Sequence, residues 1–381
     1  MSDTPRVTVE TIRLGADRLS GAEVRQLTSS PTIDSNIYGE IPYMDPSSRW
    51  VIFLRSPDTW RTGEVWRADL ERGWLEPVCD RVPDLRAVTQ SPDQRYFYCR
   101  RAFKGNRWEL LRTEVATLEQ TTFVLDGAPQ PRSLATAGAD NRTYVYATKL
   151  EDGDFGIVRC DLELGEWEVI HTGHDICNAH PQLEPGQGQV CLIQHNRGCE
   201  IDERGRIVHL VGPEGATLYL IDVASGNKTE LPVGKPYTAP CQGHQCWIGD
   251  TGEVLLTISG PDLATVLEHG NLLRIRPGDV AARAVAVGFN FVHPNASRDG
   301  RFFVSDTRTP DGVLLVVGSI RTGRTRVLCD SRATLSAPQY THPHPYFSPD
   351  CRWVIFNSDG SGLPNVCAAR VPDGMLEELD C

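Results

Sequence analysis

The sequence predicts an all-β protein, a seven-bladed β-propeller with four strands in each blade. Three observations predict it: one short phrase recurs along the chain, hydrophobic residues alternate with a period of two inside each copy, and helical periodicity is nearly absent. The phrase is a polar turn around Pro-Asp or Asp-Gly, followed by an apolar strand. Its copies are spaced by roughly 45 to 65 residues, which is the length of a four-stranded blade. The seven copies begin at Asp45, Ser91, Ala137, Glu184, Gly249, Ser297 and Ser348.

The two ends of the chain are predicted to meet. The stretch GAEVRQLT, residues 21–28, resembles the closing strand of a blade without the strands that would precede it. We therefore expect it to complete the seventh blade and to close the ring. Because no linker or low-complexity segment divides the chain, residues 1–381 are predicted to form a single β-propeller domain.

Composition argues against several classes of function. The chain of 381 residues is 40% hydrophobic and 23% charged, as in a globular protein with a sizeable core. Its formal net charge of -12 argues against a nucleic-acid or anionic-membrane partner, which would favour a basic face. We find no signal peptide and no apolar run long enough to span a bilayer. The twelve cysteines form no CxxC pair and are expected to be reduced thiols, so a cytoplasmic location is predicted.

Four of the ten histidines share one position in the repeat. Each stands six residues before the Asp of its turn, or before the Gly that replaces it. In a propeller, equivalent positions at the start of the innermost strands surround the central channel, so these side chains are expected to converge at one mouth. The four are His180, His244, His293 and His344.

This register predicts a metal site. His342 and His344 are two residues apart on a strand, so both point to the same face, and His293 comes from the neighbouring blade. Such a set of imidazoles suits a transition metal. The alternative for any single histidine is a hydrogen bond to channel water or backbone. His171 and His174 lie outside the register and are expected to be loop histidines.

With these residues in view, the sequence resembles the oligogalacturonate lyases, seven-bladed propellers that degrade short pectin fragments inside bacteria. The HPHP core with a glutamine three residues upstream is a specific signature, and the resemblance is strongest over residues 178–359. Three segments carry it: GHQCWIGD around His244, FVHPNASRDG around His293, and QYTHPHPYFSPD with Gln339, His342 and His344.

The resemblance implies a role for each of these residues. In that family three histidines and one glutamine bind manganese, and the proposed base falls on His244. The assisting arginine falls best on Arg204, with Arg206 and Arg197 as alternatives because the spacing differs. The implied ligands are His293, Gln339, His342 and His344.

One segment departs from the family. After the strand that ends at His195 this chain reads QHNRGCEIDERG, where the family has an acidic residue, Gly and Pro directly after the histidine. The substrate pocket is therefore expected to be altered, and a different uronate is an open alternative. His180 and Arg197 are predicted to contact the substrate.

The predicted activity is metal-dependent β-elimination on short uronic-acid oligosaccharides. A metal on the substrate carboxylate would acidify the C5 proton, and a neutral imidazole would remove it. By ligand preference alone three imidazoles would suit zinc, nickel or copper, whereas a Gln oxygen and the resemblance favour Mn²⁺. The alternatives are a non-catalytic propeller that senses sugars or binds proteins, and another metal-assisted reaction on a carbohydrate. A monomer and a homodimer are both compatible with the sequence.

Overall fold

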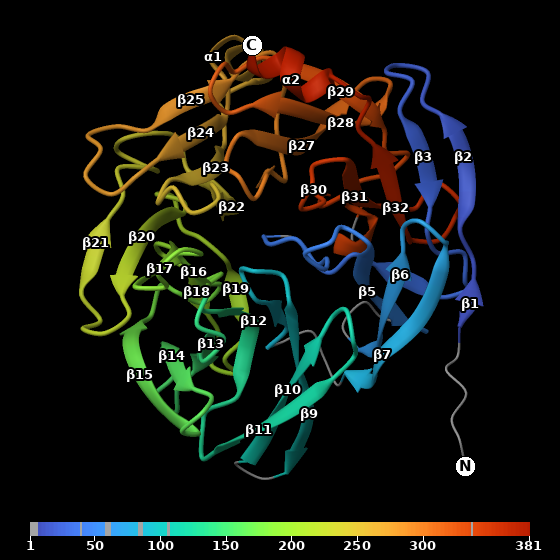
Figure 1. Ribbon diagram of the computed structural model, residues 1–381. Coiled ribbons are helices and arrows are strands. Elements are labelled where there is room, and N and C mark those ends of the chain that lie inside the picture. Colours follow the sequence, from blue (N-terminus) through green and yellow to red (C-terminus); the bar gives the residue numbers. More distant parts are fainter. Residues whose placement is uncertain (1–6, 39, 58–61, 83–86, 105–106, 337) are drawn as a thin grey trace, which may run out of the picture.

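Seven antiparallel sheets are arranged in a ring around a central channel (Figure 1). The computed structural model describes residues 7–381 apart from 39, 58–61, 83–86, 105–106 and 337. The chain runs through the sheets in order, and most of the first strands contact the first strand of a neighbouring blade. The predicted seven-bladed propeller is therefore confirmed.

Five of the blades are four-stranded sheets, each built from one continuous stretch of chain. Blade 2 contains β8 (Thr89–Gln90), β9 (Tyr96–Lys104), β10 (Arg107–Glu114) and β11 (Gln120–Asp126), and blade 3 contains β12 (Pro131–Ala137), β13 (Thr143–Lys149), β14 (Phe155–Asp161) and β15 (Glu166–Gly173). Blade 4 contains β16 (Gln182–Leu183), β17 (Val190–His195), β20 (Thr217–Asp222) and β21 (Lys228–Glu230). Blade 5 contains β22 (Cys241–Trp247), β23 (Val254–Ile258), β24 (Leu272–Ile275) and β25 (Arg283–Ala286), and blade 6 contains β26 (Asn295–Ala296), β27 (Phe302–Thr309), β28 (Gly312–Ser319) and β29 (Thr325–Asp330).

Blades 1 and 7 each gain a fifth, outer strand from the N-terminal residues, an addition that the sequence did not predict. The predicted closing strand is β3, which pairs with β32 so that Val24 lies opposite Ala369. Blade 1 contains β4 (Ile33–Ser35), β5 (Trp50–Ser56), β6 (Gly63–Asp69), β7 (Trp74–Val82) and the added β1 (Thr8–Val9). Blade 7 contains β30 (Tyr346–Phe347), β31 (Trp353–Ser358), β32 (Asn365–Arg370), β3 (Glu23–Gln26) and the added β2 (Ile12–Ala16).

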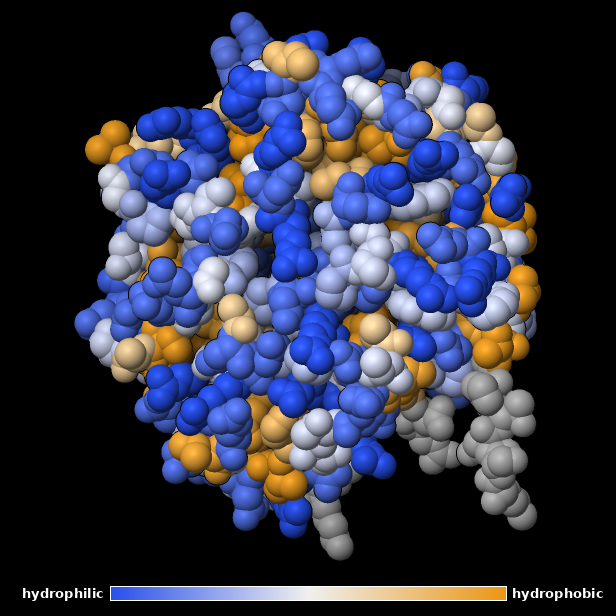
Figure 2. Space-filling model, viewed as in Figure 1, coloured by the Kyte–Doolittle hydropathy of each residue, from blue (hydrophilic) through white to orange (hydrophobic). Residues whose placement is uncertain are grey.

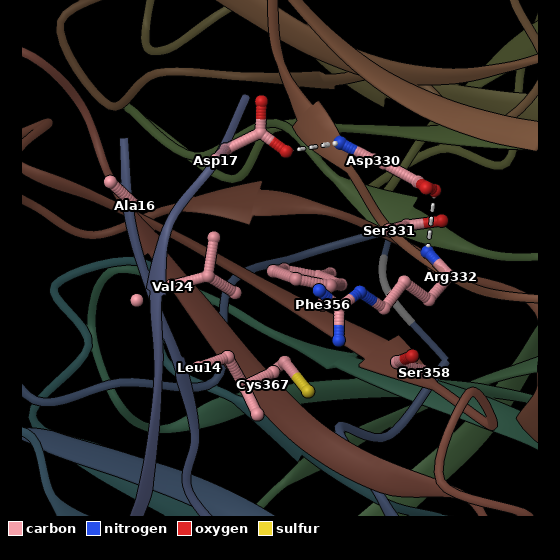
Figure 3. A pocket seen from close by; sticks show the side chains of 11 residues that line it. Leu14, Ala16, Asp17, Val24, Asp330, Ser331, Arg332, Phe356, Ser358 and Cys367 are labelled. Atoms are coloured by element: carbon pink, nitrogen blue, oxygen red, sulfur yellow. Dashed lines mark hydrogen bonds between the residues drawn. The ribbon is translucent and has the colours of Figure 1, made fainter. Parts of the chain in front are cut away.

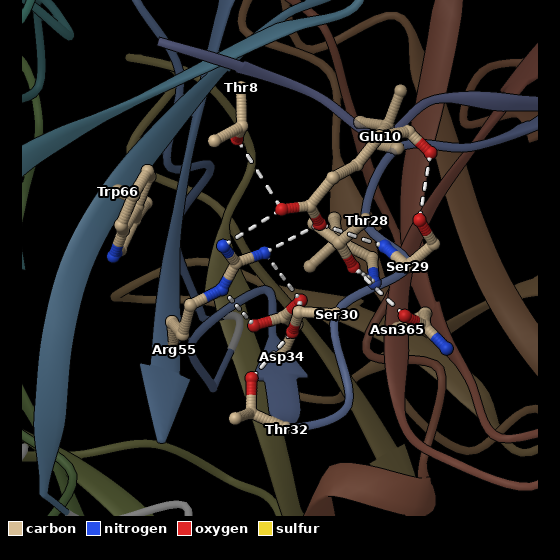
Figure 4. A network of polar contacts seen from close by, with 12 residues as sticks. Thr8, Glu10, Thr28, Ser29, Ser30, Thr32, Asp34, Arg55, Trp66 and Asn365 are labelled. Atoms are coloured by element: carbon tan, nitrogen blue, oxygen red, sulfur yellow. Dashed lines mark hydrogen bonds and ion pairs between the residues drawn. The ribbon is translucent and has the colours of Figure 1, made fainter. Parts of the chain in front are cut away.

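A polar network fastens the N-terminal segment to blade 1 next to this closure (Figure 4). The Arg55 guanidinium donates to Asp34 Oδ1 at 2.9 Å and to Glu10 Oε2 at 2.8 Å. Asp34 is fully buried, and burial raises its pKa even though the arginine opposes that rise. A buried charge needs such a partner, so Arg55 joins two segments that the ring brings together.

Hydrogen bonds and backbone conformation explain why the same turn sequence recurs in each blade. In the copy from Ser348, the serine hydroxyl donates to Asp350 at 2.6 Å and accepts from the Trp353 N–H at 3.0 Å, so side chains complete the turn. One residue in each of the seven turns has a positive φ, which explains the frequent glycine there. These residues are Ser48, Gln94, Asn141, Gly188, Gly252, Gly300 and Cys351.

The hydrophobic core lies between the blades. Each apolar cluster joins strands of neighbouring sheets, as where Trp108 of blade 2 packs against Tyr146 of blade 3. The middle strands are therefore buried on both faces, and every residue of β5 except Arg55 is buried. These strands therefore depart from the strict period-two alternation expected from the sequence, as in Trp50–Leu54, which is apolar throughout.

Three short helical segments and one inserted hairpin complete the described chain. They are α1 (Leu263–His269), α2 (Met375–Asp380), the 3₁₀ turn η1 (Gln339–Thr341), and the hairpin of β18 (Glu200–Ile201) and β19 (Ile207–His209). The hairpin separates β17 from β20, which explains the longer repeat interval in blade 4. Among the described residues, neither α-helix has the length and apolar character needed to cross a membrane.

Candidate metal centre

The histidines of the shared register lie at the starts of the innermost strands of blades 4 to 7. His180, His293 and His344 each precede the first strand of their blade by two residues, and His244 lies within β22. Because the blades are arranged in a ring, these starts face the channel from successive sides (Figure 1). His342 lies just before His344 and follows η1 directly.

Four imidazoles form one cluster. A ring nitrogen from each of His293, His342 and His344 lies within 4.8 Å of the other two. His293 is at the centre, with its ring centroid 4.4 Å from that of His344 and 5.3 Å from that of His342. On its other side the His244 ring is 4.3 Å away. The structure thus brings together every histidine that the sequence assigned to metal binding or to the base.

Hydrogen bonds fix the orientation of two rings. His293 Nδ1–H donates to the fully buried Asp306, at 2.9 Å to Oδ1 and 3.0 Å to Oδ2, so the Nε2 lone pair stays free. His342 Nε2–H donates to the carbonyl of Ser336 at 3.0 Å, which leaves the Nδ1 lone pair free. Histidine ligands of metals nearly always donate their second N–H to a carboxylate or a carbonyl in this way.

Two asparagines hold the backbone of the HPHP segment. Asn36 donates its side-chain amide to the His344 carbonyl at 2.9 Å, and Asn357 donates to the His342 carbonyl at 3.2 Å. Asn357 also accepts the backbone N–H of Asn36 at 2.7 Å. His344 has a φ of 42°, a strained value for this residue that the two amides help to maintain.

The buried nitrogens of this cluster lack protein partners. His342 Nδ1 and His344 Nε2 are buried and accept no hydrogen bond among the described residues. Burial, together with neighbouring histidines, lowers the pKa of His342 and lowers that of His344 well below its usual value. Unpartnered buried nitrogens in neutral imidazoles cost free energy, and a bound cation would satisfy them. The residues present therefore fit a divalent metal.

His244 stands beside these three rings with its own free nitrogen. Burial, then the proximity of His293 and His180, lowers its pKa well below the usual value, so the ring is neutral at pH 7. The Val292 carbonyl accepts a hydrogen bond from this ring, whereas its buried Nδ1 has no partner. A neutral imidazole with a free lone pair can accept a proton.

His180 has a different environment from the other histidines. Its Nδ1 is hydrogen-bonded to the Glu40 carboxylate, and the two side chains are only 15% and 10% exposed. Burial lowers the pKa of His180, but the charge and hydrogen bond of Glu40 outweigh it and the net pKa is raised. Tyr38 lies between this pair and the metal cluster, with its ring centroid 5.7 Å from that of His180 and 4.7 Å from that of His344. His180 is therefore the imidazole of this mouth that favours a positive charge.

The other predicted residues are less closely joined to the cluster. Gln339 begins η1, and its backbone carbonyl accepts the His342 N–H at 3.0 Å, but its side chain is exposed. Arg204 lies in the exposed turn between β18 and β19, where its backbone N–H donates to Asp202 at 3.0 Å. The guanidinium of Arg197 donates to the carbonyls of Gly215 and Lys235 at 3.0 and 2.7 Å, so it holds the base of the insertion.

Three residues at this mouth were not found from the sequence. Tyr38 and Glu40 belong to the connection between β4 and β5, which reaches into the centre of the ring (Figure 1). No repeat or motif marks that connection. Asp306 did leave a signal, because an acidic residue in the apolar strand FFVSDT must be buried and therefore needs a partner.

Two cavities lie outside the set of four imidazoles, and one of them adjoins Glu40. A cavity of about 380 Å³ is lined by residues of the strand-joining turns of blades 2 to 6 and by Glu40, Gln182 and Asn295. A cavity of about 30 Å³ lies between β2 and the end of β29, lined by Asp17 and Arg332 among others (Figure 3). That small cavity shares no residue with the histidine cluster. The face drawn in Figure 2 is mainly hydrophilic over the middle of the ring.

Comparisons with known proteins support the resemblance that the sequence suggested. No protein-family model matches the chain. It is 35% identical over 237 residues to an oligogalacturonide lyase of Pectobacterium atrosepticum, a match that covers 58% of this chain and 56% of that relative. A match to an oligogalacturonate lyase of Dickeya dadantii is 46% identical over 39 residues and covers 10% of each chain. The chain thus matches little more than half the length of the first relative and a small part of the second.

Two solved structures share the whole fold. An oligogalacturonate lyase in complex with manganese is 17% identical, with a TM-score of 0.73 over 96% of this chain and 99% of that one. An oligogalacturonate lyase of Vibrio parahaemolyticus is 18% identical, with a TM-score of 0.74 over 97% of this chain and 99% of that one. The resemblance predicted from the sequence is confirmed: the chain is similar to oligogalacturonate lyases, in sequence over little more than half of its length and in fold over nearly all of it.

Proposed function

We propose that the protein is a metal-dependent lyase that cleaves short uronic-acid oligosaccharides by β-elimination. The observation that carries the proposal is the cluster of imidazoles: three with ring nitrogens within 4.8 Å of one another, and His244 neutral beside them. The similarity to oligogalacturonate lyases supports this choice of reaction and of substrate class.

His293, His342 and His344 would hold the metal, with Gln339 as the fourth predicted ligand. The free lone pairs at His342 Nδ1 and His344 Nε2 support the first three, and the exposed Gln339 side chain would have to turn toward them. Mn²⁺ is the metal we propose, because one of the structural neighbours is an oligogalacturonate lyase in complex with manganese. When bound, the metal would draw charge from the substrate carboxylate and so acidify the proton on the adjacent C5.

His244 would remove that proton. Its ring is neutral at pH 7 and its Nδ1 has no protein partner, so the lone pair is available to the substrate. The electron pair left on C5 forms the C4–C5 double bond as the glycosidic oxygen leaves C4. Protonation of the leaving oxygen by water then gives one unsaturated uronate and one shortened chain.

Positive groups at the mouth would position the acidic sugar. Glu40 raises the pKa of His180, so this ring holds more positive charge near neutral pH than an ordinary histidine does. Its N–H could donate to a uronate carboxylate or hydroxyl. Arg204 is on the hairpin of blade 4, and contact with substrate requires its exposed side chain to reach over the mouth. Arg197 would support that hairpin rather than act alone, because its guanidinium already donates to three carbonyls.

We further propose that the protein acts in the cytoplasm on a small acidic oligosaccharide, as a monomer or homodimer and without a nucleic-acid or membrane partner. Its twelve cysteines are free thiols, and most are buried, which agrees with a reducing compartment. The net charge of -12 agrees with the absence of a polyanionic partner.

The decisive experiment is mass spectrometry of the products formed from digalacturonate with Mn²⁺, with a chelator-treated sample as control. We expect a metal-dependent product lighter by one water than the product of hydrolysis. The matched variants are His244→Gln and His269→Gln, since His269 is exposed on α1. Hydrolysis products, or equal turnover after chelation, would refute the proposed reaction. Full activity in His244→Gln would refute the proposed base.

A further inference from the structure

A second group of metal-binding side chains lies on blade 4, away from the four imidazoles described above. It lies where the segment before β16 meets the insertion that follows β17. One donor atom from each of His174, Asp175 and Cys199 lies within 4.8 Å of the other two. A second thiol, that of Cys177, is hydrogen-bonded to Cys199. The group therefore offers nitrogen, oxygen and two sulfur atoms.

The spacing of these donors suits a small tetrahedral cation. Cys199 Sγ lies 3.9 Å from Asp175 Oδ1. Bonds of about 2.0 to 2.3 Å at tetrahedral angles place neighbouring donors roughly 3.5 Å apart, so only a small contraction is needed. His174 is exposed, with its Nδ1 3.3 Å from Asp154 Oδ1, whereas Cys199 is only 6% exposed.

The types of donor atom in this group indicate which metal it would prefer. Thiolates favour zinc and related soft cations over Mn²⁺, and His, Cys and Asp are all zinc ligands. A cysteine must lose its proton to ligate zinc. Binding would therefore release protons and would strengthen as the pH rises.

The inserted hairpin between β17 and β20 buries little apolar surface that would hold it to blade 4. Residues 196–215 place β18 and β19 on the surface, and the three residues of β19 are all exposed. Val208 is 56% exposed and Leu210 is 43% exposed, so little apolar burial holds the hairpin down. Its base is held by polar contacts to the donor group: Asn196 N–H donates to the Asp175 carbonyl at 2.6 Å, and Gly198 N–H donates to Asp175 Oδ2 at 3.3 Å.

We propose that His174, Asp175, Cys177 and Cys199 form a structural zinc site that fastens the inserted hairpin to blade 4. The proposal would give the exposed His174 a role beyond that expected of a loop histidine. It also gives a physical role to the segment in which this chain departs from the family. The proposal does not depend on the reaction, because its ligands are separate from the imidazole cluster.

The first test is titration with Co²⁺, a spectroscopic substitute for zinc, followed by electronic absorption. We expect a thiolate-to-cobalt band in the parent protein and in His344→Ala, because the imidazole cluster contains no thiol ligand. The band should be lost in Cys199→Ser and kept in Cys351→Ser, a control at a partly buried cysteine of blade 7. Absence of the band from the parent, or its persistence in Cys199→Ser, would overturn the assignment.

A second variant covers the case in which Cys199→Ser does not fold. His174 is exposed, so His174→Ala leaves the core intact and should weaken Zn²⁺ binding at this site at least tenfold in calorimetry. Trypsin should cut the hairpin after Arg204 at least tenfold more slowly with Zn²⁺ than with chelator. An unchanged zinc affinity in His174→Ala, an unchanged cleavage rate, or an intact mass showing a disulfide between Cys177 and Cys199 would each overturn the proposal.

Discussion

Replacing Asp306 by asparagine should weaken metal binding without removing any metal ligand. The carboxylate accepts His293 Nδ1–H at 2.9 and 3.0 Å and also accepts the His293 backbone N–H at 2.9 Å. Asparagine keeps one acceptor oxygen but loses the negative charge, so one charge-assisted bond becomes neutral. The difference is about 1 to 2 kcal/mol, which corresponds to a roughly 5- to 30-fold higher Kd for Mn²⁺.

The assay is calorimetric titration of chelator-treated protein with Mn²⁺, and Asp311→Asn is the matched control. Asp311 lies in the exposed turn between β27 and β28 of the same blade. The control should keep the parent affinity, and both variants should keep the parent circular dichroism spectrum. A Kd for Asp306→Asn within twofold of the parent would show that the orientation of His293 does not govern the site.

Three further predictions concern the base, the pH dependence of stability and the ring closure. His244→Gln should bind Mn²⁺ within threefold of the parent yet lose at least 100-fold in turnover on digalacturonate, because a general base contributes 10²–10⁴-fold. Folding depresses the pKa of His344 and of His244, so the unfolded chain binds more protons below pH 6.5. Metal-free protein should therefore lose unfolding free energy in urea as the pH falls from 7.5 to 5.5. Leu27→Ala, beside the closing strand and fully buried, should cost about 2 to 5 kcal/mol in the same assay.

Each of these three has an outcome that would contradict it. Loss of Mn²⁺ binding in His244→Gln would make that residue a ligand rather than the base. Equal or greater stability at pH 5.5 would show that His180, whose pKa is raised and which acts in the opposite direction, outweighs the histidines whose pKa is lowered. A Leu27→Ala variant as stable as an exposed control, Leu164→Ala, would show that β3 adds little to the ring.

The architecture was predictable because it repeats. A turn residue and a strand pattern recur in every blade, so seven weak local signals support one another. Residues 21–28 are recognised as a closing strand because the three strands that should precede them in a blade are missing. The added strands β1 and β2 were not predictable in the same way, because they occur once and are largely exposed. That the whole chain forms one domain stays a prediction.

The site was predictable where it follows the repeat and, for His342, from its spacing of two residues from His344. His244, His293 and His344 share a register, and the ring converts that register into proximity. Glu40 contacts His180 across 140 residues of sequence from a connection with no repeat counterpart, so its partner could not be inferred. The arginine assignments remain predictions, because they depend on the one segment in which this chain departs from the family.

The closure of blade 7 sets the order in which the metal site can be assembled. His342 and His344 precede β30, whose sheet is completed by β3 from residues 23–26. A chain leaving the ribosome therefore makes β3 and its outer neighbour β2 first, and β3 cannot pair with β32 until residues 367–369 emerge. Pairing between strands so far apart in the sequence is slow, because the entropy cost of closing the loop comes before any stabilising contact forms. His342 and His344 belong to the last blade to be synthesised, so we expect the imidazole cluster to form only when the ring closes.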